Sequence, residues 1–153
     1  MKILCLLGTV ACLLTALNAN CQQAVLPLNQ HPPEKALLFN HLPEKFSCPV
    51  NALQNIFSAS VNNRLSVSLG PQLNIEGTVL AKVAVTPDQL SINIRCTNFQ
   101  NALLNISRIT KTDGSFSYIG RIVSLEHGDV LLLWEEDGQY TFIRQKQLLA
   151  MVE

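Results

Sequence analysis

The sequence predicts a mainly all-β protein: an antiparallel meander of about seven strands that closes as a barrel or folds into a sandwich, with one short N-terminal helix. Three observations lead to this fold class. Apolar and polar residues alternate from Leu90 to Thr97, as in a strand with one buried face. Asp113-Gly114 and Asp137-Gly138 separate β-type runs and are typical of tight hairpin turns. The connections, at about four to six residues, are too short for parallel crossovers.

The strands follow one another with short turns between them. Alternation or apolar content predicts strands over 64–69, 73–85, 90–97, 103–109, 116–123, 130–134 and 139–144. The long segment keeps one apolar parity, so Ala81, Val83 and Val85 are expected on the core face, with Gly77 at a bulge or bend. Val130–Trp134 is apolar at every position, which is typical of a strand buried on both faces or central in the core.

A short helix is expected to begin around residues 47–50. Ser47 or Cys48 would lie near its N-cap, and Pro49 suits the first helical position. Apolar residues then recur at helical spacing and predict one buried face, made of Val50, Leu53, Ile56 and Phe57. Such a helix would cover a sheet edge or one barrel mouth.

The first residues have the features of an export signal. Met1-Lys2 is basic, Ile3–Ala16 is uncharged and nearly all apolar, and small residues follow, which together predict a secretory signal peptide over residues 1–21. Cleavage is expected after Ala19 or Cys21. Lipoprotein anchoring at Cys21 is the less favoured alternative, because residues 18–20 match a lipoprotein signal poorly. The mature chain, with no transmembrane span, is therefore expected to be secreted or periplasmic.

Two parts follow the signal peptide: a Pro-containing extended leader over residues 22–46 and a single β-rich domain over residues 47–153. Four prolines interrupt every pattern in the leader: Pro27, Pro32, Pro33 and Pro43. Ala36–Phe39 is expected to pack on the domain as an anchor. The alternative is an arm that lies on a partner.

The cysteines predict one disulfide. Cys5 and Cys12 leave with the signal peptide, and if Cys21 leaves too, Cys48 and Cys96 remain. Two cysteines in an exported chain most simply pair, and the long loop closed by a Cys48–Cys96 bond would contribute roughly 4 kcal/mol. Two buried free thiols are the alternative.

The sequence offers little for catalysis or for metal binding. The three histidines lie in the leader or in a turn and lack zinc-ligand spacing: His31, His41 and His127. Glu135, Glu136 and Asp137 share a hairpin tip, where equal contact with water disfavours an acid/base pair. The 11 basic and 11 acidic residues form no basic patch, which argues against nucleic acid as a partner. We therefore expect no enzyme, no cofactor and no metal site.

Four aromatic residues fall on neighbouring predicted strands: Tyr118, Trp134, Tyr140 and Phe142. A cluster across paired strands would serve core packing. The more specific alternative is a ligand pocket lined by these rings.

Two stretches, LSINIRCTNF at Leu90–Phe99 and SYIGRIVSLEHGDVLLL at Ser117–Leu133, together with the ending Leu148–Glu153, resemble small exported proteins of Bacteroidota that carry no assigned function. The resemblance spans roughly Leu37 to the end of the sequence. It implies an envelope or secreted location. Its motifs are strands and turns, so it implies no catalytic residue.

These observations favour an exported, non-enzymatic protein-binding module whose partner is another exported or envelope protein. The candidate interaction residues are those of two polar hairpin tips: His127, Gly128, Asp129, Glu135, Glu136 and Asp137. A specific version is a peptidase inhibitor that inserts Gln22–Pro43 or the Glu126–Asp129 turn into a protease cleft.

Three rival functions stay open. The main alternative is a carrier of a small apolar ligand inside the barrel. An enzyme that uses Glu135, Glu136 or His127 is a further one. A chaperone-like or pro-segment role fits the same observations as the binding module.

Overall fold

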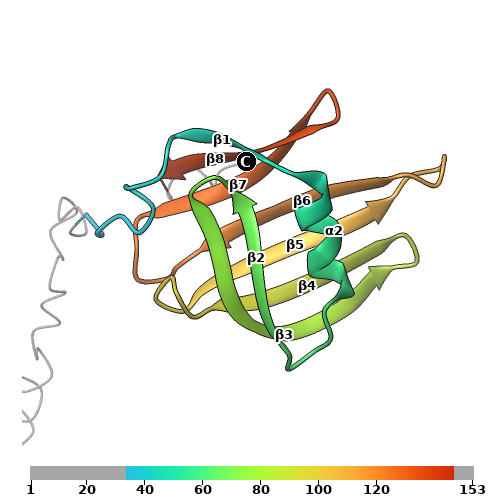
Figure 1. Ribbon diagram of the computed structural model, residues 1–153, viewed down its shortest axis with the longest axis horizontal. Helices are drawn as coiled ribbons and strands as arrows, with labels where there is room; N and C mark the ends of the chain where they lie inside the picture. The colour runs from blue at the N-terminus through green and yellow to red at the C-terminus, as the bar shows by residue number, and fades with distance from the viewer. Residues whose placement is uncertain (1–33, 147–153) are drawn as a thin grey trace, which may run out of the picture. The chain divides into compact units, whose positions relative to one another are not determined.

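The computed structural model describes residues 34–146, and the predicted signal peptide and Cys21 lie outside them. Eight strands and one helix follow in chain order: β1 (Lys45–Cys48), α2 (Val50–Ser58), β2 (Arg64–Gly70), β3 (Leu73–Thr86), β4 (Gln89–Cys96), β5 (Ala102–Thr110), β6 (Phe116–Val123), β7 (Asp129–Glu136) and β8 (Gln139–Lys146). Figure 1 shows β2 to β8 as one meander with β1 added beside β8, and every paired neighbour is antiparallel. The predicted all-β class is confirmed, and β1 is the strand that the sequence patterns did not indicate.

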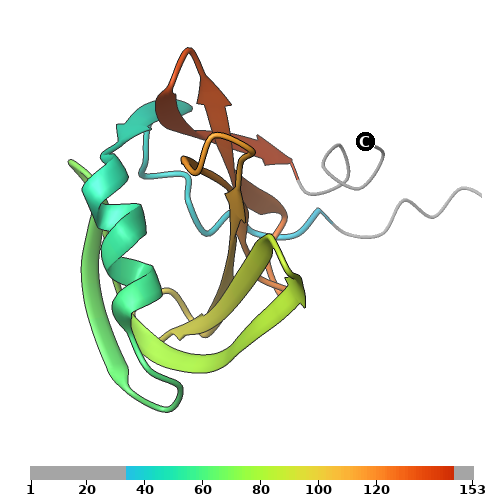
Figure 2. The ribbon, with the colours of Figure 1, turned by 90° about the vertical axis from the view of Figure 1, so that its right-hand side faces the viewer.

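The single sheet curls into a half-barrel and does not close. Its strand order is β1-β8-β7-β6-β5-β4-β3-β2, so β1 and β2 are the two ends, and no ladder joins them among the described residues. Figure 2 shows the sheet wrapping around the core, with α2 lying along the open side. The core is filled by side chains from every strand and from the helix, including Phe39, Leu53, Ile56, Leu104, Tyr118 and Phe142.

The helix begins later than predicted. Ser47 and Cys48 belong to β1, and Pro49 takes the N-cap position, with extended φ and ψ of −72° and 134°. Proline has no N–H for a ladder bond, so the same residue ends the strand and begins the helix without a loop. The predicted apolar face is buried at Leu53, Ile56 and Phe57, whereas Val50 is exposed.

A bulge at Leu80 exchanges the inward-facing and outward-facing side chains in the second half of β3. Val79 pairs with Ile94 and Ala81 pairs with Asn93, so Leu80 is the extra residue. One inserted residue moves every later side chain to the opposite face. The expectation that Ala81, Val83 and Val85 face the core was therefore wrong. Ala81 pairs with the outward-facing Asn93, and Val85 is the extra residue of a second register shift between Ala84 and Thr86. Val83 and Val85 are both more than half exposed. Lys82 now points inward, where its Nζ donates to the Phe57 carbonyl at 2.5 Å near the end of α2.

The predicted Cys48–Cys96 disulfide is not formed, and both residues are buried free thiols. Cys48 lies on the end strand β1 opposite Tyr140, whereas Cys96 lies on β4 opposite Gly77 and Ala102. The sheet order sets β8, β7, β6 and β5 between these two strands, while a disulfide requires Cβ atoms within about 4.5 Å. Burial raises the pKa of Cys48 to about 12 and that of Cys96 to about 11, so both thiols stay protonated at neutral pH.

Residues 34–44 pack onto the sheet through a buried carboxylate. The two oxygens of Asp129 accept the backbone N–H groups of Leu38 at 2.7 Å and Phe39 at 2.8 Å. Of the predicted anchor Ala36–Phe39, Leu38 and Phe39 are buried, whereas Ala36 and Leu37 are exposed. The Gly128 N–H also donates to the Ala36 carbonyl at 2.9 Å, and the Arg144 guanidinium donates to the Phe39 carbonyl at 3.2 Å. We call Asp129 and its two N–H donors the Asp129 clamp.

We expect Asp129→Asn to loosen residues 34–44 and to lower the free energy of unfolding by about 2 kcal/mol or more, because an amide NH₂ would face one of two N–H donors in a buried site. Urea unfolding measures the loss, and limited proteolysis reports new cleavage within 34–44. Glu34→Gln is the matched control, because it breaks an exposed contact with Lys146 and is expected to leave both readouts unchanged. Equal stability of Asp129→Asn and the natural protein would contradict the clamp.

Candidate binding groove between the two end strands

A groove of about 960 Å³ opens where the half-barrel fails to close. One wall is β2, the other is the end of β1 with the first turns of α2, and the β7–β8 turn closes one end. The lining residues are Ser47, Cys48, Pro49, Val50, Asn51, Ala52, Asn55, Leu65, Ser66, Val67, Ser68, Gly70, Pro71, Gly138, Gln139 and Tyr140. The volume is at the upper end of the range for ligand pockets.

The free edge of β2 faces this groove. Hydrogen-bonded and non-hydrogen-bonded residue pairs alternate along an antiparallel ladder. The Asn63–Val79 pair is hydrogen-bonded, because the Val79 N–H donates to the Asn63 carbonyl at 3.0 Å. The backbone N–H and C=O groups of Leu65 and Val67 are therefore hydrogen-bonded to β3. Those of Ser66 and Ser68 point away from β3. The partner side agrees, because Glu76, opposite Ser66, accepts its hydrogen bond from Thr97 on the far side.

The end strand β1 presents a shorter edge by the same alternation. The Arg144 N–H donates to the Glu44 carbonyl at 2.8 Å, so the peptide groups of Lys45 and Ser47 point away from β8. The two edges meet at Gly70, where a Cβ atom would lie 2.8 Å from the Phe46 ring and 3.2 Å from the Ser47 carbonyl oxygen.

The groove carries no charged side chain, because none of its lining residues is Asp, Glu, Lys, Arg or His. Its inner wall is apolar, with Cys48, Ala52, Val67 and Tyr140 buried, and its rim is neutral and polar, with Ser66 and Asn51 exposed. Burial keeps the Cys48 thiol neutral, as its raised pKa of about 12 shows. No side chain caps the first N–H groups of α2, which lie at the same wall.

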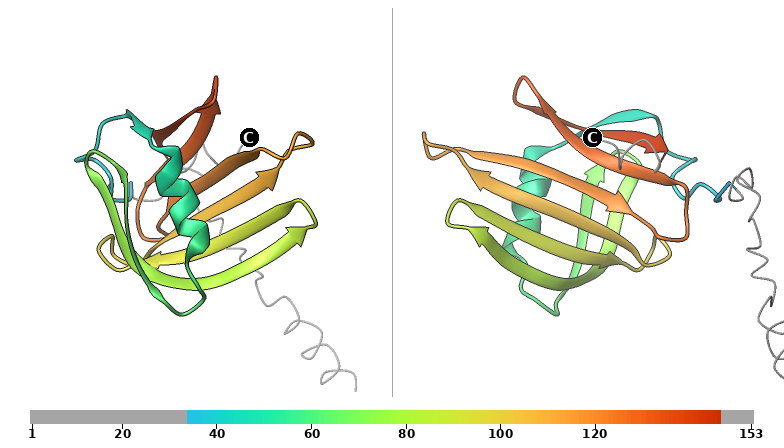
Figure 3. Two further views of the ribbon diagram at one scale, coloured as in Figure 1. Left: turned by 45° about the vertical axis from the view of Figure 1, so that its right-hand side comes forward. Right: turned by 180° about the vertical axis from the view of Figure 1, so that it is seen from behind.

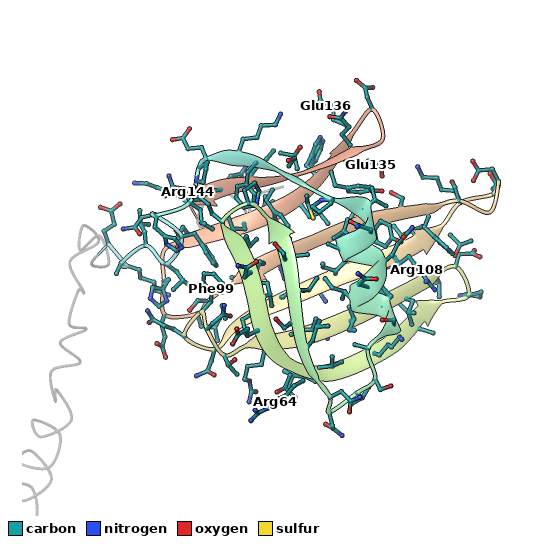
Figure 4. The ribbon with its side chains drawn as sticks, viewed as in Figure 1. Arg64, Phe99, Arg108, Glu135, Glu136 and Arg144 are labelled. Carbon is teal, nitrogen blue, oxygen red and sulfur yellow. The ribbon has the colours of Figure 1, made fainter. Side chains whose placement is uncertain are left out.

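The predicted interaction residues do not form one site. His127 and Gly128 belong to the β6–β7 loop and Asp129 begins β7, and together they hold residues 34–44. Asp129 and His127 are buried, and the His127 Nδ1 lies 2.9 Å from the Ser124 hydroxyl. At the other hairpin, Asp137 and Gly138 have φ of 52° and 74° and make the two-residue turn between β7 and β8. Figure 4 shows Glu135 and Glu136 near this turn, far from Arg144 at the other end of β8.

Glu135 takes part in a hydrogen-bond network at the barrel mouth. Its Oε2 accepts from the Ser117 hydroxyl at 2.5 Å and from the Tyr140 hydroxyl at 2.9 Å, and Lys111 lies 3.4 Å from Oε1. The Ser117 hydrogen bond, with help from Tyr140 and Lys111, holds the pKa of Glu135 below its usual range. Glu136 is exposed and lies 3.7 Å from Lys45. The three acidic residues are thus not equivalent, contrary to expectation.

The predicted aromatic cluster forms without its tryptophan. Tyr118 and Tyr140 meet edge to face with ring centroids 5.6 Å apart, and Phe57 of α2 lies 5.8 Å from Tyr118. Phe142 is fully buried and stacks on Phe46 instead. Trp134 points outward and is 58% exposed. Tyr118 and Phe142 belong to the core, whereas Tyr140 also lines the groove.

Sequence reasoning missed the groove, because its residues are ordinary Ser, Asn, Val and Leu side chains. The available signal was Pro49, which forbids a continued ladder and so leaves β1 too short to close the sheet.

Comparison with known proteins found no protein-family model, no curated protein and no solved structure that matches this chain. Within residues 34–146, no helix has the length and apolar content to cross a membrane.

The two tyrosines of the cluster give opposite predictions. The Tyr118 hydroxyl is buried with no hydrogen-bond partner among the described groups, so Tyr118→Phe is expected to raise the free energy of unfolding by about 1 kcal/mol. The Tyr140 hydroxyl accepts the Tyr118 N–H at 3.2 Å and donates to Glu135, so Tyr140→Phe is expected to lower it by about 1–3 kcal/mol. Urea unfolding of both variants measures the difference. Equal losses would contradict this network.

Proposed function

We propose that this protein is an exported binding module that holds an extended, uncharged polypeptide segment in the groove by adding it as a strand to β2. The supporting observation is that a free strand edge forms one wall of a charge-free groove. Unpaired N–H and C=O groups of an edge strand are a template for another chain, and strand addition is a recurrent mode of peptide recognition.

The longer edge favours β2 as the pairing strand. Arg64–Gly70 has seven residues, whereas Lys45–Cys48 has four. Seven successive antiparallel pairs make β1 and β2 run in opposite directions, so an inserted segment can be antiparallel to only one of them. We expect it to pair with β2 in the antiparallel sense, which is the slightly more stable arrangement.

The groove walls indicate the chemistry of the segment. Side chains alternate between the two faces of an added strand, so every second residue would meet the apolar inner wall around Val67, Ala52 and Tyr140. The residues between them would face the neutral rim at Ser66 and Asn51. A charged residue in the inner positions would lose water without gaining a partner, and this cost disfavours it.

Other functions have less support from the described residues. The peptidase-inhibitor version would insert Gln22–Pro43 or the Glu126–Asp129 turn. Residues 34–43 and that turn pack against each other through Asp129 and Gly128, and residues 22–33 lie outside the described part of the chain. A carrier needs an interior cavity, yet the interior is occupied by fully buried side chains such as Phe39, Leu104 and Phe142.

Selection of a random 12-residue peptide library on the purified protein tests the proposal. We expect enrichment of uncharged peptides with apolar residues at alternate positions. Synthetic copies are then titrated against two variants at one position. Ser66→Ala keeps the backbone donor and is expected to bind like the natural protein. Ser66→Pro removes the N–H that points into the groove and is expected to weaken binding by about two- to tenfold, since a backbone hydrogen bond contributes about 0.5–1.5 kcal/mol.

Thermal unfolding of both variants controls for the fold, because proline is tolerated where an edge N–H faces away from the ladder. The proposal fails if no peptide is enriched, or if peptides bind Ser66→Pro and Ser66→Ala equally well.

A further inference from the structure

Val130 is buried on the outer face of the sheet, the face that points away from α2. Along β7, Leu131 and Leu133 point into the core, so Val130, Leu132 and Trp134 point outward. Val130 is nevertheless only 2% exposed, and it is not part of the core cluster. The right panel of Figure 3 shows the outer face toward the viewer, and no described helix or strand lies in front of it. The outer face of a curled sheet is convex, so side chains there splay apart, and an apolar one this buried needs a cover.

Exposure rises away from Val130 in both directions that the sheet defines. Along β7, Leu132 is partly buried and Trp134 is 58% exposed. Across the strands, Val130 pairs with Val123, which is partly buried, and Val123 pairs with Leu103, which is 39% exposed. The cover is therefore local, and its centre lies at Val130.

The chain leaves β8 beside this point. Val130 pairs with Gln145, and Lys146, the last residue of β8, pairs with Asp129. The seven residues that follow lie outside the described part of the chain. They carry one charge, at Glu153, and four large apolar side chains: Leu148, Leu149, Met151 and Val152.

The described residues do not account for the cover. Segment 34–37 reaches this end of β7, because the Ala36 carbonyl accepts the Gly128 N–H, but all four of its residues are exposed, unlike those of a segment packed on an apolar face. Ser107 also points outward and is buried, yet it is small and its hydroxyl lies 2.5 Å from that of Ser91, so its burial has a local cause.

We infer that residues 147–153 turn back after β8 and pack their apolar side chains on the outer face of β7, over Val130 and Leu132. An extended chain spans at most about 3.5 Å per residue, and a reversal over about two residues leaves five, or about 17 Å. Val130 and Trp134 are four residues apart on one strand, or about 13 Å. The segment therefore spans Val130 and Leu132 and ends close to Trp134, which agrees with the rise in exposure along β7.

The charges around Val130 suit this segment. It is uncharged up to Glu153, so no charge is buried where it crosses Val130. Two positive side chains, Arg121 and Lys45, point outward on the cross-strand row of Leu132, where they flank a negative end. Glu136 lies beyond them and is already 3.7 Å from Lys45. Exposed ion pairs contribute little, so apolar burial is the main source of affinity. The groove lies on the α2 side of the sheet, so this inference does not depend on the proposed peptide binding.

NMR of the full protein with a soluble gadolinium chelate tests the inference, because the chelate relaxes only methyl groups that solvent reaches. We expect shielded Val130 methyl groups, with nuclear Overhauser effects to the methyl groups of Leu148 or Leu149. Leu148→Ser combined with Leu149→Ser is expected to raise the relaxation of the Val130 methyl groups several-fold. Gln147→Ser, in the same segment, is the matched control and is expected to leave it unchanged.

Carboxypeptidase digestion tests the contact from the side of the sheet. Val130→Ser is expected to speed the removal of residues 147–153 by about tenfold or more, because cleavage follows the population of the released segment. Tenfold corresponds to about 1.4 kcal/mol, which is less than burial of a valine side chain typically contributes. Val83→Ser, the same change at a 52% exposed residue of β3, is expected to leave the rate unchanged. A circular dichroism spectrum of each variant verifies that the sheet is intact.

Three outcomes would overturn the inference. Val130 methyl groups that the chelate reaches in the natural protein show that nothing covers them. Shielding that survives the double serine variant, or an unchanged digestion rate in Val130→Ser, shows that a different segment covers Val130. Shielding that disappears on dilution shows that the cover belongs to a second copy of the chain.

Discussion

The architecture depends on one constraint: α2 occupies the space that a closing ladder between β1 and β2 would need. Pro49 ends β1 and begins the helix without a loop, so the chain must enter the mouth of the half-barrel at once. The buried face of the helix, including Leu53, Ile56 and Phe57, then supplies the core contacts that a closed barrel would obtain from its own strands. An eight-stranded sheet that could close therefore stays open.

The open edges are protected by their surroundings. A free strand edge invites aggregation, and proteins blunt it by covering it with other elements. Here the edge of β2 faces α2 across a confined groove and touches β1 at Gly70 and Phe46. The same geometry that hinders edge-to-edge association thus supports selective binding of a single strand.

Sequence patterns predicted the central strands well, because each has one buried face and a clear period of two. Leu90–Cys96 is the best example, and its side chains alternate as expected from Ile92 to Cys96. Prediction failed where the outcome depends on long-range geometry. No local pattern indicates that Leu80 is bulged, so the later residues of β3 were assigned to the wrong face. The separation of Cys48 and Cys96 depends on sheet order, which spacing along the chain does not encode.

The candidate site was harder to predict than the fold, for a physical reason. Sequence reasoning looked for charged residues at turns, and it selected Asp129 and Glu135, which serve internal hydrogen bonds. The groove bears no charged side chain, and its distinguishing feature is an unpaired backbone edge. Trp134 illustrates the difference, since an isolated tryptophan in an apolar run predicts burial, whereas its parity on β7 places it outside.

The proposed binding groove depends most directly on the free edge of β2. Amide hydrogen exchange of the unliganded protein, followed residue by residue by NMR, tests whether that edge is unpaired. We predict that the N–H groups of Ser66 and Ser68 exchange orders of magnitude faster than those of Leu65 and Val67, which donate to β3. Equal, strong protection along Leu65–Ser68 would show that the edge is already paired or covered. That result would contradict both the open half-barrel and the groove proposed as a binding site.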